Sequence, residues 1–312
     1  AGIGIGATGG GLTLGNLNAA VGGINLSADT GTLQAGNLTI GNGNVVVTDS
    51  GGSIVLGNVS TTAYGSSGGA DGSVTVQSSG GIQTGAISTY ANAGSSFASA
   101  YVSLEANSSR FGTPTTGGDV TVLGSISTDA ELNGSGNADG SVQINNSAGG
   151  IGTQDITTFA VQRGSLNFAA AGIGGGPTLG GGSYGNGSIT LAATNGDITT
   201  GALTVTDGSS IGVTTTTAGN INVGQMSAYA SSSDGGVGPG QLNNVTLSSA
   251  GGITTNGTAI TAQGVTLNAG TAASGGTGGD ISTGNITVLG GGLDSADYGG
   301  SMTLGNISAA GT

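Results

Sequence analysis

The sequence predicts an all-β fold: a right-handed parallel β-helix (β-solenoid) with three short strands in each coil. Three observations lead to this prediction. A short phrase recurs along the whole chain, an alternating apolar triplet precedes it, and the spacing between phrases never falls below 21 residues. Self-similarity with such a minimum spacing is typical of stacked repeats.

The recurring phrase reads apolar, any, Thr or apolar, usually Gly, any, apolar. It runs from "LTLGNL" at Leu12 to "MTLGNI" at Met302, with looser copies at Val120 and Ile253. Successive starts are separated by 21, 21, 28, 38, 31, 47, 23, 32, 28 and 21 residues. A core coil of about 21 residues with Gly/Ser-rich loop insertions of variable length produces these spacings.

A second element, an alternating triplet, begins eight or nine residues before a phrase. Its copies are "INL" at 24, "VVV" at 45, "VTV" at 74, "VQI" at 142, "ITL" at 189 and "VTL" at 245. Alternation over three to five residues indicates a strand with one buried face. One unit therefore reads strand, polar turn, strand, Gly corner, strand, and the corner glycines are expected to supply positive φ angles.

The insertions are expected to be loops. The segments "YANAGSSFASA" (90–100), "SSRFGTPTTGG" (108–118) and "GIGGGPTLGGGSYGNG" (172–187) are rich in Gly and Ser. The three prolines, which cannot donate a hydrogen bond to a strand ladder, also fall in such stretches, at Pro114, Pro177 and Pro239. A β-sandwich or jelly roll built of hairpins would explain strands and turns, but it does not explain a shared minimum spacing of 21 residues with a variable excess.

Both ends of the chain carry parts of the repeat rather than a capping element. The triplet "IGI" at 3–5 precedes Leu12, and the chain closes on "MTLGNISAAGT" at 302–312. We therefore expect residues 1–312 to be one continuous β-helical shaft, either a segment of a longer rod or one unit of an end-to-end filament. Coils stacked about 4.8 Å apart would make it about 50 Å long.

Composition excludes several functional classes. The formal net charge is −13, and the basic side chains are only Arg110 and Arg163, so a nucleic-acid partner is not expected. No apolar run approaches the roughly 20 residues of a membrane-spanning helix. The chain has no His, Lys or Cys, so a nucleophilic triad has no base and disulfides play no part. We expect a protein that is not an enzyme.

The acidic residues mostly lie in turns beside Gly or Ser, as at Asp71, Asp119, Asp139, Asp197 and Asp280. Asp119, Asp197 and Asp280 each precede a phrase, so they could stack on one edge of the rod, and polar turn residues are the simpler interpretation. The segments "GGADGSV" (68–74) and "GNADGSV" (136–142) lack the spacing of Gly–Asp calcium repeats. No cofactor is expected, beyond calcium bound weakly at acidic turns.

Two side-chain patterns recur at fixed places in the unit. Tyr90, Phe159 and Tyr229 each sit eight residues after their phrase start and are followed by Ala, which defines an aromatic surface slot. The slot could stack on sugars, although structural aromatics covering a core edge are the simpler interpretation. Asn residues of the phrase are expected to stack as a structural amide ladder, at Asn16, Asn37, Asn58, Asn285 and Asn306.

The segments "GSITLAATNGDITTGALTV" (187–205) and "GGDISTGNITVLGGG" (278–292) resemble the repetitive shafts of filamentous-haemagglutinin-like bacterial exoproteins, many of which are exported by two-partner secretion. The likeness is a style of repeat that covers most of the chain. It implies a parallel β-helix shaft, an extracellular location, and a role in adhesion or matrix building. It implies no catalytic residues, and the family's amino-terminal secretion domain is not apparent in these residues.

We therefore expect a non-enzymatic structural protein, extracellular or on a bacterial cell surface, that forms a fibre or adhesin shaft. Its expected partners are copies of itself, end to end and laterally, and surface polysaccharide such as a biofilm matrix. The alternative is a carbohydrate-binding or carbohydrate-cleaving β-helix of the cell surface or of a phage tailspike, which needs acids and aromatics on one face. An ice-binding solenoid needs a regular Thr array, whereas "TTTT" at 214–217 is isolated.

Overall fold

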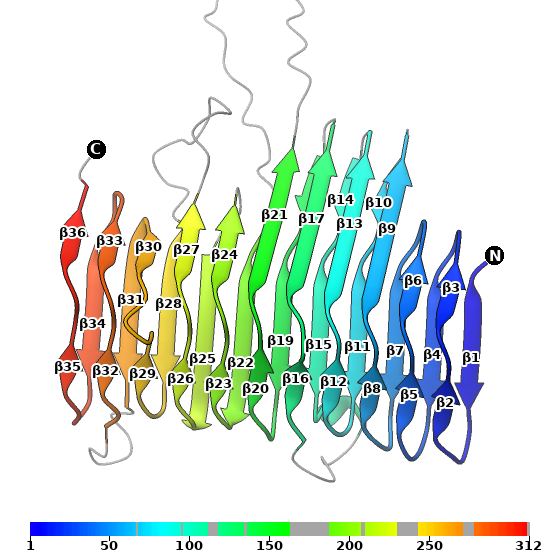
Figure 1. Ribbon diagram of the computed structural model, residues 1–312, viewed down its shortest axis with the longest axis horizontal. Helices are drawn as coiled ribbons and strands as arrows, with labels where there is room; N and C mark the ends of the chain where they lie inside the picture. Colours follow the sequence, from blue (N-terminus) through cyan, green and yellow to red (C-terminus); the bar gives the residue numbers. More distant parts are fainter. Residues whose placement is uncertain are drawn as a thin grey trace, which may run out of the picture.

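The chain winds into a column of stacked coils, with the two termini at opposite ends (Figure 1). The computed structural model describes residues 1–66, 68–94, 96–111, 118–133, 136–162, 187–206, 210–229, 243–270 and 278–310. Within these ranges it is a parallel β-helix with three strands in most coils, as the repeat predicts. No helix among the described residues is both long and apolar enough to cross a membrane.

Among the described residues, three sheets of 11 strands each run the length of the column. Sheet A holds the triplets, in β1 (Ile3–Ala7), β4 (Ile24–Ala28), β7 (Val45–Asp49), β11 (Val74–Ser78), β15 (Val102–Ala106), β19 (Val142–Asn146), β22 (Ile189–Asn195), β25 (Ser210–Ala218), β28 (Asn244–Ser249), β31 (Gly264–Ala269) and β34 (Leu293–Asp297). Sheet B holds the phrase starts, in β2 (Leu12–Leu14), β5 (Leu33–Ala35), β8 (Ile54–Leu56), β12 (Ile82–Thr84), β16 (Val120–Val122), β20 (Ile151–Thr153), β23 (Ile198–Thr199), β26 (Ile221–Asn222), β29 (Ile253–Thr254), β32 (Ile281–Ser282) and β35 (Met302–Thr303). Sheet C follows the corner, in β3 (Leu17–Ala19), β6 (Leu38–Ile40), β9 (Val59–Gly65), β13 (Ile87–Ala93), β17 (Ile126–Leu132), β21 (Ile156–Gln162), β24 (Leu203–Thr206), β27 (Met226–Tyr229), β30 (Ile260–Ala262), β33 (Ile286–Val288) and β36 (Ile307–Ala309).

The register of sheet B confirms the repeat residue by residue. Leu12 pairs with Leu33, and the series continues through the looser copies to Ile281, which pairs with Met302. The longest separation also keeps register, because Ile151 pairs with Ile198. The strand pairings among the described residues are parallel, which excludes a sandwich of antiparallel hairpins.

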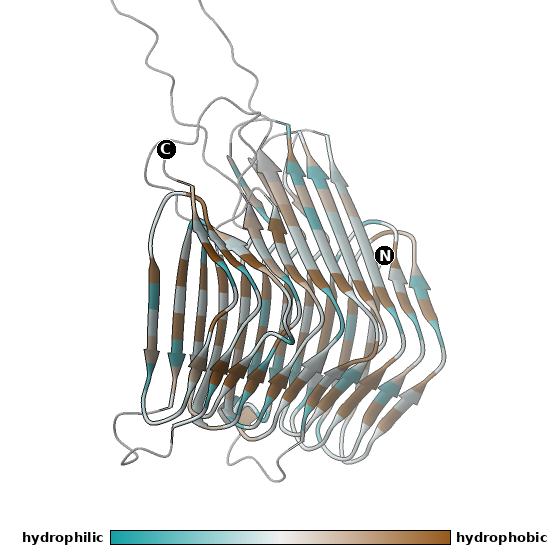
Figure 2. Ribbon diagram, turned by 60° about the vertical axis from the view of Figure 1, so that its left-hand side comes forward, coloured by the Kyte–Doolittle hydropathy of each residue, from teal (hydrophilic) through white to brown (hydrophobic). Residues whose placement is uncertain are grey.

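One apolar core fills the inside of the column. In the second coil Ile24, Leu33 and Leu38 have no exposed surface, while Asn25 and Gln34 between the inward positions face solvent. Apolar residues take the same places in each coil, so they form bands that run from coil to coil (Figure 2). Each coil therefore buries its core against the coils on both sides, as solenoid repeats do.

The loop expected at 90–100 is wrong, because this segment is built of strands. The end of β13 and β14 (Ser96–Ser99) lie in it, and β14 pairs in parallel with β10 (Ala70–Asp71) and β18 (Gly136–Asp139) to form sheet D. The coils that contain these strands have four strands rather than three. The sheet C strands that lead into sheet D, β9, β13 and β17, are longer than β6, and the next strand, β21, is equally long (Figure 1).

Alanine is the reason that sheet D can form. Sheet D packs on the extended part of sheet C through a second, small core that is separate from the main core. The inward residues are mostly alanines: Ala63, Ala70, Ala91, Ala93, Ala98, Ala100, Ala130, Ala138 and Ala160, with Leu132. Several of their register partners are again alanines, as with Ala91 and Ala130. Such short side chains let two strand layers approach closely.

Threonine hydroxyls close the boundary between the two cores. Thr61 donates to the Gly72 carbonyl, Thr89 to the Ala100 carbonyl and Thr128 to the Gly140 carbonyl. These threonines occupy one column of sheet C, and all three are buried. Each hydroxyl therefore satisfies a backbone carbonyl at the end of sheet D that burial would otherwise leave unpaired.

The other expected loops fall largely outside the described residues. In the 108–118 segment the structure shows a 3-10 helix, η1 (Ser109–Phe111), and nothing is described from 112 to 117. Residues 163–186 are also outside, and with them nearly all of the 172–187 segment. The three prolines also lie outside the described residues, so the expectation that Pro114, Pro177 and Pro239 fall in loops stays a prediction.

The corner glycines do not have the positive φ angles that the sequence predicted. Glycines with positive φ lie at other turns, such as Gly31 and Gly43, and not at Gly36 or Gly57. The corner glycine instead leaves room for the coil before it. A Cβ on Gly57 would lie 2.5 Å from Asn37 Oδ1 and 2.9 Å from the Asn37 backbone nitrogen. Close approach, rather than backbone conformation, requires Gly here.

The turn that follows sheet A carries buried polar residues, such as Asp49, which pairs in register with Ala28. Asp49 has no exposed surface, and its Oδ2 accepts from the Leu33 N–H at 3.1 Å while Oδ1 accepts from Gly51 N–H at 3.0 Å. Burial raises the pKa of the Asp49 carboxyl above its ordinary 3.8, against the lowering effect of these backbone hydrogen bonds. The nearby Asp29 charge raises this pKa further.

We predict that Gly57→Ala lowers the free energy of unfolding by about 1–3 kcal/mol, because the new methyl overlaps backbone of the preceding coil that cannot swing away. Gly212→Ala is the control, since a Cβ at Gly212 meets nothing within 4 Å. It should be neutral or stabilise by at most about 1 kcal/mol. Urea unfolding followed by circular dichroism measures both, and equal effects would contradict the close-approach argument.

We predict that Asp49 makes stability depend on pH in an identifiable direction. Because its pKa is raised in the fold, its favourable contribution is complete below 3.8 and is lost as pH rises through the folded-state pKa. The unfolding free energy of the wild type, minus that of Asp49→Asn, should therefore fall as pH increases from 3.5 upward. Urea titrations across this range test the sign, and a difference that rises with pH would refute it.

Candidate functional site

The expected Asn ladder forms as two runs of stacked residues, but the bonds differ from amide-to-amide contacts. Asn16 Oδ1 accepts from the Asn37 backbone N–H at 2.8 Å, and Asn37 Oδ1 accepts from that of Asn58 at 2.9 Å. At the other end, Asn285 Oδ1 accepts from the Asn306 N–H at 3.1 Å. Each side chain thus holds the backbone of the next coil, in the space left by the corner glycine.

Asp155 occupies the same register position between the two Asn runs, and it too accepts a backbone hydrogen bond from the next coil. Its Oδ1 accepts from the Ala202 N–H at 2.8 Å, and a Cβ on Gly201 would lie 2.2 Å from that oxygen. The requirement at this corner is therefore a short side chain with a carbonyl-type acceptor. We assign the column a structural role.

The three acids that precede phrases also share one column, at the entry to sheet B. Asp119 accepts from the Gly150 N–H at 2.8 Å, Asp197 from Asn220 at 2.7 Å and Asp280 from Ser301 at 2.8 Å. They bond to the following coil, so they form a second ladder. Two hollows lie along it, one of them about 450 Å³ and lined by Asp197, Asn220, Gly252 and Asp280 among others.

The acids of the two "ADGS" segments hold their own turns. Asp71 Oδ1 accepts from the Ser73 N–H and Asp139 Oδ1 from the Ser141 N–H, both at 3.0 Å. Each is therefore a turn of the Asx type in which a side chain bonds two residues ahead. Within the described ranges, no three acidic, His or Cys side chains group closely enough to hold a metal ion.

The aromatic slot is a register column on the outward face of sheet C. Tyr90 pairs with Asp129, Asp129 with Phe159, Phe159 with Thr206, and Thr206 with Tyr229. The three aromatic residues therefore share the slot but alternate with polar residues, so they are not direct neighbours. The side chain of Tyr229 lies outside the described part of the structure.

Tyr64 is a residue that the sequence analysis missed. It lies near the end of β9 with 61% of its surface exposed, and its ring is 5.6 Å from that of Tyr90 at an angle of 56°. Its register partner is Asn92, which in turn pairs with Glu131. The available signal was that Tyr64 lies two residues after Thr62, on the same strand face. This signal is useful only if β9 is known to extend as far as Tyr64.

Hydrogen bonds join the polar members of this surface. Asn92 Nδ2 donates to Glu131 Oε2 at 2.8 Å and to the Tyr90 hydroxyl at 3.0 Å, while Asn133 Nδ2 donates to Asn92 Oδ1 at 3.0 Å. Burial raises the pKa of the Tyr90 phenol, the Asn92 hydrogen bond lowers it, and the charges of Glu131 and Asp129 raise it further. Tyr90 therefore stays neutral at physiological pH.

We call this surface the sheet C patch, defined by Tyr64, Tyr90, Asn92, Asp129, Glu131 and Phe159. It combines partly exposed rings with amide and carboxylate groups on one face. It is the place where the described residues bring aromatic and acidic side chains together. Such an arrangement is suited to noncovalent binding, because rings offer flat apolar contact and the polar groups offer directed hydrogen bonds.

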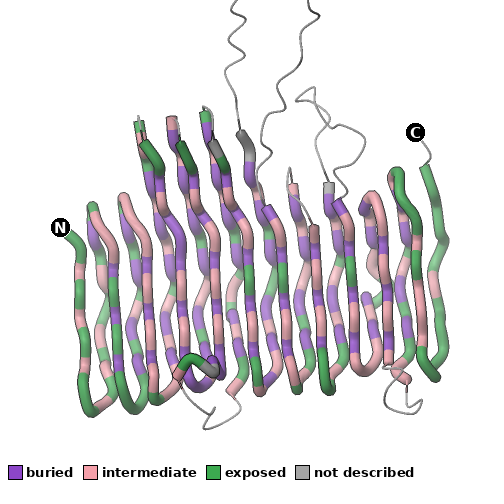
Figure 3. Tube along the Cα trace, turned by 180° about the vertical axis from the view of Figure 1, so that it is seen from behind, coloured by how far each residue is buried: buried purple, intermediate pink, exposed green. Residues whose placement is uncertain are grey.

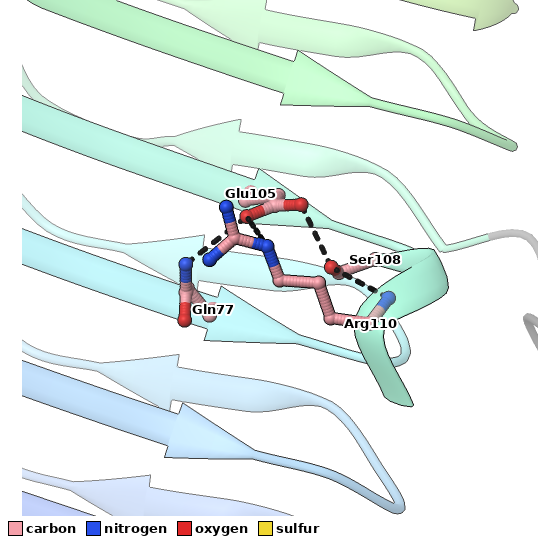
Figure 4. Close-up of polar contacts among 4 residues, drawn as sticks. All are labelled: Gln77, Glu105, Ser108 and Arg110. Carbon is pink, nitrogen blue, oxygen red and sulfur yellow. Dashed lines mark hydrogen bonds and ion pairs between the residues drawn. The ribbon is translucent and has the colours of Figure 1, made fainter. Parts of the chain in front are cut away.

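Arg110 lies away from the patch, on the sheet A side. Its Nε is 3.9 Å from Glu105 Oε2, which also accepts from Gln77 Nε2 at 3.1 Å (Figure 4). Ser108 Oγ donates to Glu105 Oε1 at 2.7 Å, so the group fastens η1 to β15. A pair with 68% of the Arg110 side chain exposed contributes little stability, so its role is local.

The chain matches no protein-family model, no curated protein and no solved structure in the comparisons made.

We predict that Asn37→Ala speeds hydrogen exchange at the Asn58 amide, because that N–H loses its side-chain acceptor. One lost hydrogen bond of about 0.5–1.5 kcal/mol corresponds to roughly a 2- to 12-fold faster exchange. Asn37→Asp keeps the acceptor, as Asp155 does naturally, and should leave exchange nearly unchanged. Amide exchange followed by mass spectrometry measures both. If the two variants behave alike, the ladder does not hold the next coil.

Proposed function

We propose that this chain is shaft material: a non-enzymatic extracellular structural protein whose β-helix continues end to end. The proposal rests on the exposure of apolar core positions in the last coil. Ile307 and Met302 are 53% and 40% exposed, whereas their register partners one coil earlier, Ile286 and Ile281, have no exposed surface. A further coil stacked there would bury both side chains.

The first coil has the matching form. Ile3, Leu12 and Leu17 are partly exposed, whereas the residues that follow them in register, Ile24, Leu33 and Leu38, are fully buried. The end coils are accordingly more exposed than those inside (Figure 3). Because both ends carry apolar core positions in register, we infer that a further coil stacks on each, supplied by the same polypeptide or by a second copy.

An adhesive role in an extracellular, bacterial setting is supported by the resemblance of the repeats to filamentous-haemagglutinin-like shafts. The outward strand positions are mostly Ser, Thr, Asn and Gln, and charged residues make up 5% of the chain. A surface of this kind can lie against copies of itself or against surface polysaccharide with little charge repulsion. The strand ladders provide the stiffness that a shaft needs.

We predict that the 312-residue chain associates into rods longer than one column, and that Ile307→Asp weakens this association at least about tenfold. The reason is that stacking would bury the new carboxylate without a partner. Sedimentation velocity over a range of concentrations, with electron microscopy of the same samples, measures the effect. Leu123→Asp is the control, because Leu123 is also exposed, at 61% against 53% for Ile307, but lies on the flank of a middle coil.

Rods formed by the wild type and by Leu123→Asp, together with monomers of Ile307→Asp, are the expected result. Single compact columns of the wild type at every concentration would contradict stacking between copies. Rods that Leu123→Asp disrupts as strongly as Ile307→Asp would instead place the contact on the flank.

A further inference from the structure

The sheet C patch runs along the axis of the column rather than around it. Its residues form two rows, Tyr90, Asp129 and Phe159 in one and Tyr64, Asn92 and Glu131 in the other. Neighbouring strands lie about 4.8 Å apart, so the four strands β9, β13, β17 and β21 span about 14 Å. The patch therefore fits a short linear ligand lying parallel to the axis.

The chemistry of the rows identifies the kind of ligand. The exposed ring of Tyr64, braced against Tyr90, offers a flat apolar surface of the kind that packs on the C–H face of a sugar ring. Beside it, the side-chain oxygen of Asn92 and the carboxylate of Glu131 offer acceptors within a connected hydrogen-bond network. Rings next to fixed acceptors suit a molecule with both C–H faces and hydroxyl groups.

Charge excludes the main competing ligands. The net charge of −13 disfavours binding of an anionic glycan, a phosphate or a nucleic acid. The described cation, Arg110, is paired with Glu105 on sheet A. An apolar protein surface fits poorly, because covering the polar side chains of both rows would cost free energy.

We propose that the sheet C patch binds a neutral oligosaccharide, with Tyr64 stacking on a sugar ring, Tyr90 supporting Tyr64, and Glu131 and Asn92 accepting hydrogen bonds from the sugar hydroxyls. The site lies on the flank of the column, so it does not depend on end-to-end stacking. It would give a shaft protein a lateral attachment point to neutral polysaccharide.

The test uses the 312-residue chain and four neutral probes: the hexasaccharides of cellulose, chitin, starch and mannan. Hexagalacturonate serves as the anionic control probe. Isothermal titration calorimetry measures binding, and tyrosine emission gives a second readout because the chain has no Trp. We expect at least one neutral probe to bind with a dissociation constant of millimolar or better, and hexagalacturonate to bind at least tenfold more weakly.

Variants locate the binding. Tyr64→Ala and Glu131→Gln should each weaken it about tenfold or more, whereas Tyr298→Ala should not, although Tyr298 is also exposed, at 46%. Ile307→Asp should bind like the wild type, so failure of the stacking proposal would leave this result intact. The proposal is overturned if no neutral probe binds, if hexagalacturonate binds more tightly, or if Tyr64→Ala binds as well as the wild type.

Discussion

Parallel hydrogen bonding between equivalent strands of successive coils is the constraint on which the rest of this structure depends. A slip of one residue would turn every inward side chain outward, so each strand must return to the same register. The chain between strands is much less constrained. Ile151 and Ile198 pair directly although 47 residues separate them, whereas Ile281 and Met302 pair across 21. An insertion between strands is compatible with the fold when the next strand returns to the same register.

The sequence alone predicts the strands that large aliphatic residues mark, because their alternation has a clear period of two. The starts of sheet B strands, looser copies at Val120 and Ile253 included, pair in the predicted order. Sheet D was missed because its inward residues are alanines, which resemble loop composition when mixed with Ser and Gly. Its existence depends on a second layer that no local pattern reveals.

The corner and the patch show the same limit for side chains. Sequence analysis found both Gly57 and Asn37 but explained them separately, since the space that one leaves for the other exists only between coils. Likewise, the shared slot of Tyr90, Phe159 and Tyr229 followed from counting along the repeat. Tyr64 and Glu131 lie in the neighbouring row of the patch, which exists only because β9 and β17 extend further than the repeat indicates.

The row of Asn side chains at the corner after sheet B gives the stack of coils a direction. At each Asn step, the side-chain oxygen of one coil receives the backbone N–H of the coil that follows, never the reverse. The leading face therefore presents acceptors at this corner and the trailing face presents donors. Two such columns meeting by like faces would oppose acceptor to acceptor, whereas unlike faces are complementary. Any assembly built on this contact is vectorial, with chemically distinct plus and minus ends.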